Sequence, residues 1–305
     1  MKTQKSGIAR ALLLCCGLGL VAHNAYSGDA KLDTAAIETI TGLKGAMNEQ
    51  EGVFKVSSPR NDVKASVDGW EMPPFMGLTS WAGFAVGKVN AVMVMGDLVL
   101  FQDEVNPVMS ALLDNGLSVT ALHNHFFFDE PKVFFMHLAG EGGVEPLAKG
   151  IRAALDTVKQ IRAARPQPAT GFGGEKMPEK HSITAQPLEE IFGLKGMAKD
   201  GMFKVVVGRE VKMGCGCEVG KEMGVNTWAA FAGSDESAVV DGDFAVHEDE
   251  LQPVLKSLRK AGVNIVAIHH HMSGETPRTL FLHYWGKGKA ADLAKAVKAA
   301  LEVQK

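Results

Sequence analysis

The sequence has few cysteines, little excess charge and no second long hydrophobic run. Of its four cysteines, Cys15 and Cys16 lie in an N-terminal segment that we expect to be removed, so only Cys215 and Cys217 remain. Two cysteines one residue apart exclude a disulfide framework of the kind that stabilises small secreted domains. The formal net charge of -3, without a basic stripe, argues against a nucleic-acid partner. The sequence also lacks G-x-G-x-x-G, P-loop and G-x-S-x-G motifs, so neither nucleotide binding nor an α/β-hydrolase site is indicated.

The one marked apolar run predicts a signal peptide over residues 1–27. Lys2, Lys5 and Arg10 precede about a dozen apolar residues over 11–22, and small residues follow at the expected cleavage position. The run is too short to span a bilayer comfortably, and no comparable run follows it. We therefore expect a periplasmic or secreted protein without a transmembrane helix in the mature chain. A lipid anchor on a cysteine of this segment is the alternative, although the preceding leucines fit such a signal poorly.

Six of the ten histidines form one spacing, H-x-H-x11-H, which occurs twice. The first triplet is His123, His125 and His137, and the second is His269, His271 and His283. Other segments repeat as well, such as the Gly-Leu-Lys-Gly sequences that begin at Gly42 and Gly193. A repeat of this size is a domain rather than a solenoid unit. We expect a signal peptide at 1–27, domains at 35–164 and 183–305, and a linker rich in proline and glycine at 165–182.

Within each copy, the pattern predicts strands, a helix, a two-stranded hairpin and a final helix. In the first copy these are strands near 51–57, 79–86 and 91–101, strands near 117–125 and 133–139, and a helix near 145–163. Between them, apolar residues at helical spacing from Val105 to Leu113 predict a helix that ends at Gly116. The second copy repeats this order and ends with a helix near 288–303. The expected fold is α+β (α/β-like), a tandem duplication of a mostly antiparallel sheet domain with two packed helices per copy.

The histidine spacing predicts a metal site in each copy. Residues i and i+2 of a strand share a face, so His123 and His125 point the same way. In an antiparallel hairpin, His137 can lie opposite or diagonal to His123. Three imidazoles on one ion leave a coordination position open, which is typical of catalytic zinc. Zinc or another divalent transition metal is the expected cofactor, and the alternative is that the histidines are packing or surface residues. His270 falls on the opposite face and is left out.

Carboxylates at matching positions could complete the chemistry. Glu104 and Glu250 each lie at the start of a predicted helix, and Asp97 and Asp243 each lie in a predicted strand. Either pair could supply a fourth ligand, a partner to a ligand or a general base, and we take Glu104 and Glu250 as the candidate catalytic residues. The alternatives are helix capping for the glutamates and turn formation for the aspartates.

The Cys215-Gly216-Cys217 segment occurs only in the second copy. A C-x-C pair can bind a soft metal such as Cu(I) or zinc, and Met213 and Met223 lie nearby in the sequence. The alternative is a pair of surface thiols in a glycine-rich loop. Two sulfurs alone make an incomplete site, so both interpretations stay open.

Three segments of the first copy resemble the LppY/LpqO family of bacterial exported proteins. They are Gly96–Leu100, Glu104–Met109 and Thr120–His125. That resemblance implies export but no defined chemistry. The histidine hairpin is also similar to the zinc site of acetolactate decarboxylases and of a related zinc ester hydrolase, which are built from paired α/β halves. By position, this second resemblance implies that both triplets are zinc ligands.

Three functions are therefore open. The first is a zinc-dependent hydrolase or lyase that acts on a small acid or ester. The second is a periplasmic protein that binds or handles metal without catalysis. The third is an envelope protein whose histidines are structural. A small-molecule substrate is expected only for the first, and the sequence leaves the oligomeric state open.

Overall fold

The computed structural model describes residues 31–87, 92–174 and 176–304. The predicted signal peptide, residues 1–27, lies outside the described residues. Among those that are described, no helix combines the length and the apolar content needed to cross a membrane.

The signal-peptide prediction has a direct test. If the protein is exported as predicted, intact-mass measurement is expected to give a chain that begins after Ser27, because signal peptidase cleaves after small residues that follow a short apolar run. A mass that retains Met1 would contradict the prediction.

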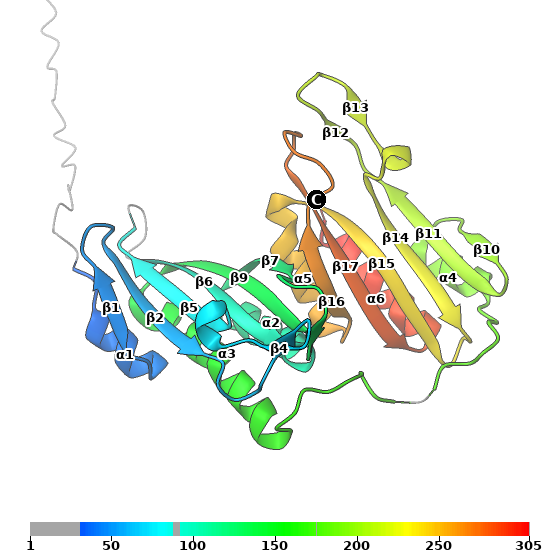
Figure 1. The fold of residues 1–305 in the computed structure, drawn as a ribbon. Coiled ribbons are helices and arrows are strands. Elements are labelled where there is room, and N and C mark those ends of the chain that lie inside the picture. Colours follow the sequence, from blue (N-terminus) through cyan, green and yellow to red (C-terminus); the bar gives the residue numbers. More distant parts are fainter. Residues whose placement is uncertain (1–30, 88–91, 175, 305) are drawn as a thin grey trace, which may run out of the picture. The chain divides into compact units, whose positions relative to one another are not determined.

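Strands from both copies form one sheet of 12 strands, in the order β1-β2-β5-β6-β9-β7-β16-β17-β15-β14-β11-β10 (Figure 1). All of its pairings are antiparallel. The main elements of the first copy are α1 (Thr34–Thr41), β1 (Gly45–Asn48), β2 (Val53–Pro59), β5 (Thr79–Ala85), β6 (Val92–Phe101), α2 (Gln102–Asp114), β7 (Ser118–His123), β9 (Val133–Gly142) and α3 (Val144–Ala164). Those of the second copy are α4 (Ala185–Phe192), β10 (Met197–Lys199), β11 (Met202–Gly208), β14 (Asn226–Gly233), β15 (Ala238–His247), α5 (Leu251–Lys260), β16 (Asn264–His269), β17 (Thr279–Gly288) and α6 (Ala290–Glu302).

Smaller elements lie at the end of the sheet where the histidine hairpins turn. In the first copy they are β3 (Ser66–Val67), β4 (Trp70–Glu71), the 3-10 helix η1 (Pro74–Met76) and β8 (Asp129–Glu130). In the second copy they are β12 (Val211–Lys212), β13 (Glu218–Val219), η2 (Lys221–Met223) and η3 (Glu248–Glu250). Strands β3, β4 and β8 form a small sheet, and β12 pairs with β13.

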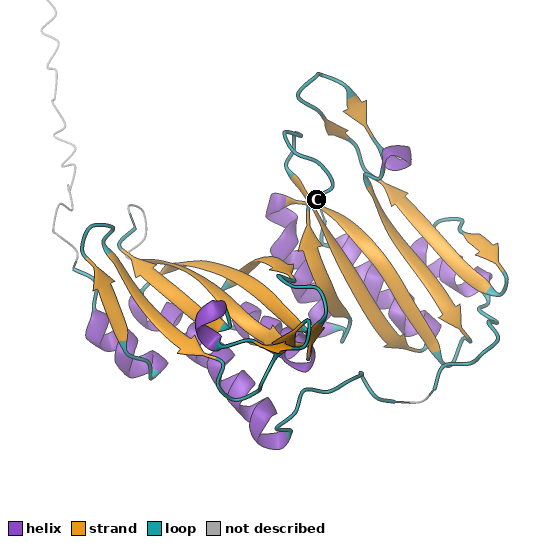
Figure 2. Cartoon of the chain, viewed as in Figure 1, coloured by secondary structure: helices purple, strands orange, loops and turns teal. Residues whose placement is uncertain are grey.

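The predicted α+β fold and its tandem duplication are confirmed, since both copies have the same order of main strands and helices. Each copy also begins with a short helix, α1 or α4, that the sequence analysis did not include. The α-helices lie on one face of the strands (Figure 2). Their apolar stripes form the core against the sheet, as Val108, Met109 and Leu112 of α2 do with 0% exposure. The histidines of the two triplets lie on the opposite face of the strands.

The two copies meet through equivalent residues. Leu122 of β7 pairs with Ile268 of β16, and these residues occupy the same position in each copy. On one side, the Asn106 side chain donates to the Ile265 carbonyl oxygen (3.1 Å) and accepts from the Ile265 amide (2.7 Å). On the other side, Gln252, the counterpart of Asn106, holds both backbone groups of Val119 (3.0 and 2.8 Å). These reciprocal contacts are those of a local two-fold axis, as in a symmetric dimer.

Candidate metal centre

Strand register places a carboxylate beside each histidine triplet. In the second copy, Asp243 of β15 lies opposite His283 of β17, and His283 also lies opposite Ala267 of β16. His269 ends β16, and His271 follows two residues later. Strand β17 lies between β15 and β16 in the sheet (Figure 1). The register therefore places the side chains of Asp243, His269 and His283 on one face of the sheet.

Asp243, His269 and His271 form the tightest group of ligand atoms. One ligand atom from each residue lies within 4.8 Å of the other two. The Nε2 atoms of His269 and His271 are 3.1 Å apart, and His271 Nε2 is 3.4 Å from Asp243 Oδ2. Two nitrogens bound to one tetrahedral zinc would be about 3.3 Å apart. The Nδ1 atom of His271 lies 3.3 Å from the Gly224 carbonyl oxygen, which orients the ring with Nε2 toward the group.

The electrostatics of this group suit a cation. The Asp243 side chain is 4% exposed, and its Oδ1 atom has no hydrogen-bond partner. Burial raises the pKa of Asp243, although the nearby His283 and His271 act in the opposite direction. Burial, together with repulsion from His283 and His271, lowers the pKa of His269 to about 4. His269 is therefore neutral at pH 7, as a metal ligand must be. A bound cation would satisfy the orphaned carboxylate oxygen and would replace lost solvation.

His283, which the sequence predicted as the third ligand, stands beside this group. Its Nδ1 atom is 3.9 Å from Asp243 Oδ1, and its ring centroid is 4.7 Å from that of His269. Its side chain is 44% exposed. The structure therefore gathers two members of the second triplet with Asp243 and leaves the third accessible at the edge. His270 points away and lies 3.5 Å from Arg278.

The first copy has the same arrangement of residues with looser ring positions. Asp97 lies opposite His137 in the sheet, and its Oδ1 atom is also buried without a hydrogen-bond partner. The ring centroid of His123 is 5.2 Å from those of His125 and His137. Burial and the neighbouring His123 lower the pKa of His125. Of the residues that the structure describes, only those of the second copy bring three ligand atoms within 4.8 Å.

In each triplet, a phenylalanine ring packs against the second histidine. The His125 ring lies flat on Phe135 with centroids 3.4 Å apart, and His271 lies on Phe281 at 3.5 Å. Both phenylalanines are buried, so they fix the histidine rings from below. The repeated packing indicates that both copies orient this histidine in the same way.

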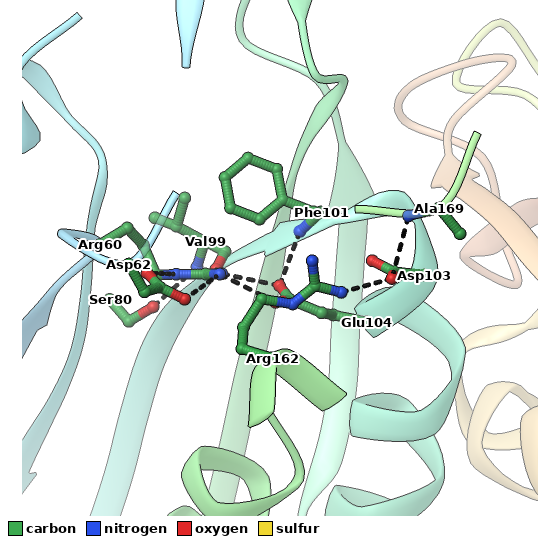
Figure 3. Close-up of polar contacts among 9 residues, drawn as sticks. All are labelled: Arg60, Asp62, Ser80, Val99, Phe101, Asp103, Glu104, Arg162 and Ala169. Carbon is green, nitrogen blue, oxygen red and sulfur yellow. Dashed lines mark hydrogen bonds and ion pairs between the residues drawn. The ribbon is translucent and has the colours of Figure 1, made fainter. Parts of the chain in front are cut away.

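Glu104, a candidate catalytic residue, is buried in a network of arginines (Figure 3). Arg60 donates to both carboxylate oxygens of Glu104 at 2.7 and 2.8 Å. The Phe101 amide donates at 2.8 Å, and Arg162 Nε lies 3.0 Å away in an ion pair. Arg162 also pairs with Asp103. The capping alternative is confirmed, because Glu104 satisfies a free amide at the start of α2.

Glu250 repeats this role in the second copy. Its carboxylate pairs with Arg209 through both oxygens, and it accepts from the His247 amide at 2.9 Å. Glu104 and Glu250 thus anchor helices to the sheet, and among the described residues neither belongs to the group of three ligands. The turn-forming alternative for Asp97 and Asp243 is wrong, because both lie within long strands. The carboxylates that lie beside the histidines are therefore those of Asp97 and Asp243.

Cys215 and Cys217 are exposed near the tip of the β12–β13 hairpin. The hairpin is joined to the loop after His271 by a pair of backbone hydrogen bonds between Lys212 and Thr276 (2.9 and 2.8 Å). Neither cysteine belongs to a group of three ligands among the described residues. The soft-metal site stays a prediction.

The chain belongs to the family described as Domain of Unknown Function (DUF1259), which it matches twice, over residues 35–157 and 186–303. No curated protein matches it. One solved structure with some similarity is a trimeric bacterial microcompartment shell protein, PduB, which is 14% identical over 85% of this chain and 89% of that one. The TM-score of 0.20 is too low to indicate a shared fold. The two family matches coincide with the two copies, so each copy is one family domain.

Proposed function

We propose that this protein is an exported zinc protein of the LppY/LpqO type that acts as a hydrolase or lyase on a small acid or ester. The observation that carries the proposal is the convergence of Asp243, His269 and His271 around an orphaned, buried carboxylate oxygen. Two imidazoles and one carboxylate match the ligand set of catalytic zinc, which keeps a position open for water or substrate. The first copy would hold a second ion through Asp97, His123 and His125.

The residues around the open position have separate tasks in this proposal. A bound zinc would bring the pKa of a water molecule near 7 and would polarise a carbonyl group. Asp243 supplies the negative charge, and His269 and His271 supply neutral nitrogens. His283 is 44% exposed and its Nδ1 atom lies 3.9 Å from Asp243 Oδ1, so it can carry a proton to or from a substrate. His137 has the equivalent position in the first copy.

A non-catalytic role in metal handling is the second candidate. The observation that favours it is the exposed Cys215-x-Cys217 pair, on a hairpin hydrogen-bonded to the loop that follows His271. Thiolates bind soft metals, so such a hairpin could pass a metal to the histidine group. This role predicts metal binding that weakens when both cysteines are replaced by serine, and no ester hydrolysis.

Zinc titration of chelator-stripped protein by calorimetry tests the proposal. We expect about two sites per chain in the native protein and about one in His269→Ala, since removing a ligand abolishes one site. His270→Ala is the matched control, because His270 is adjacent in sequence but points away from the group. Zinc-dependent hydrolysis of an aryl ester should be reduced in His269→Ala and unchanged in His270→Ala. Equal effects of the two variants would contradict the assignment.

A further inference from the structure

A cavity of about 640 Å³ lies where the two copies meet. Its walls include Val105 and Phe134 of the first copy, Phe172 of the segment between the copies, and Trp285 of β17. This volume is in the usual range for small-molecule sites. Both copies and the segment that connects them contribute to its walls. One copy alone would not form this cavity.

His283 belongs both to this cavity and to the surroundings of the metal centre. It lines the cavity, and its Nδ1 atom is 3.9 Å from Asp243 Oδ1. Its ring lies on that of His269 with centroids 4.7 Å apart. A molecule in the cavity would therefore reach the open side of the Asp243–His269–His271 group past a single imidazole.

The cavity walls favour an apolar ligand. Phe172 and Val266 are 66% and 42% exposed, so their apolar surface is available to a ligand. The amide of Asn106 is already bonded to Ile265, so the polar side chains left to meet a ligand include Gln102 and Asp241, with His283 at the side of the metal centre. The carboxylate of Asp241 would repel a second anionic group, so the acidic end of a ligand must face the metal.

We propose that this inter-copy cavity binds the apolar body of the substrate. The ligand class is a small carboxylic acid or ester with an alkyl or aryl substituent, with its acyl oxygens at the metal centre of the second copy. This inference rests on the proposed function. The substituent lies against Trp285, Phe172 and Phe134, and these side chains set the preference for its length.

The test uses full-length mature protein with His125→Ala, so that only the second metal centre is loaded with zinc. Calorimetry compares acetohydroxamate with octanohydroxamate, which share a zinc-binding head and differ in their alkyl chain. Octanohydroxamate is expected to bind at least tenfold more tightly, a difference of about 1.4 kcal/mol. Phe172→Ala should reduce this ratio, and Trp285→Ala should reduce it further. Phe172 is an exposed residue outside the helices and strands, so its truncation leaves the fold intact.

Trp81→Ala in the same background is the control, because Trp81 lies in the first copy, where it contacts Lys55. It should leave the ratio unchanged. Zinc content is measured on the same samples. Bound zinc with equal affinity for the two hydroxamates, or a ratio that neither cavity variant changes, would overturn the cavity assignment alone. Absence of bound zinc would overturn the proposed function and this inference together.

Discussion

Replacing Glu104 with alanine is expected to lower the free energy of unfolding by about 3–5 kcal/mol, because it removes the buried carboxylate that pairs with two buried arginines. The side chains of Arg60 and Arg162 are 5% and 7% exposed, and both lose an ion pair in this variant. Arg60 keeps Asp62, and Arg162 keeps Asp103, so the fold is weakened rather than abolished. Chemical denaturation followed by circular dichroism measures the change.

Glu145→Ala is the matched control for this prediction. Glu145 also forms an ion pair near the start of a helix, but both it and Lys149 are exposed at 68% and 61%. Solvent screens such exposed pairs, so they contribute little to stability. A loss below about 1 kcal/mol for Glu104→Ala would contradict the structural role of Glu104. A folded Glu104→Gln variant with normal zinc content but no ester hydrolysis would restore it as a catalytic candidate.

Zinc is expected to stabilise the folded protein strongly. A ligand that binds only the native state at a free concentration of 1,000 times its dissociation constant adds about 4.1 kcal/mol per site. For a chain of this size, that corresponds to an increase in melting temperature of roughly 10 °C. Thermal unfolding with zinc and with excess chelator measures the difference. Asp243→Asn should lower the part of this increase that comes from the second copy.

Asp241→Asn provides the control for the zinc effect. Asp241 lies on the same strand and face as Asp243, but it is exposed and outside the ligand group. It should keep the full increase in melting temperature. An unchanged melting temperature of the native protein with zinc, or an equal loss of the increase in Asp241→Asn and Asp243→Asn, would contradict zinc binding at Asp243.

Much of the fold followed from local pattern. The helical spacing from Val105 to Leu113 predicted α2, since burial against the sheet selects one face of a helix. The repeated H-x-H spacing predicted a shared face because side chains alternate along a strand. The two copies were visible as repeated segments, and each carries the same order of main elements. These features depend on neighbours in the sequence, so one sequence was enough to find them.

The site could be predicted only in part, because its remaining members depend on contacts between distant segments. Asp243 joins the histidines through the register of β15 with β17, which the sequence alone does not set. Glu104 was a catalytic candidate because the sequence does not reveal its pairing with Arg60, 44 residues away. The pairing of Leu122 with Ile268 likewise joins two residues that are far apart in the sequence. A signal for the aspartates was present in the repeat, since Asp97 and Asp243 occupy matching positions.

Metal analysis of the purified protein and of two variants shows whether each copy holds one zinc ion. We expect about two zinc ions per chain for the native protein and about one each for His125→Ala and His269→Ala. With both substitutions combined, the metal should be lost while the fold persists, because the two rings lie on the open face of the sheet. Unchanged metal content in the single variants, or a native protein that binds no metal after incubation with zinc, would contradict the account.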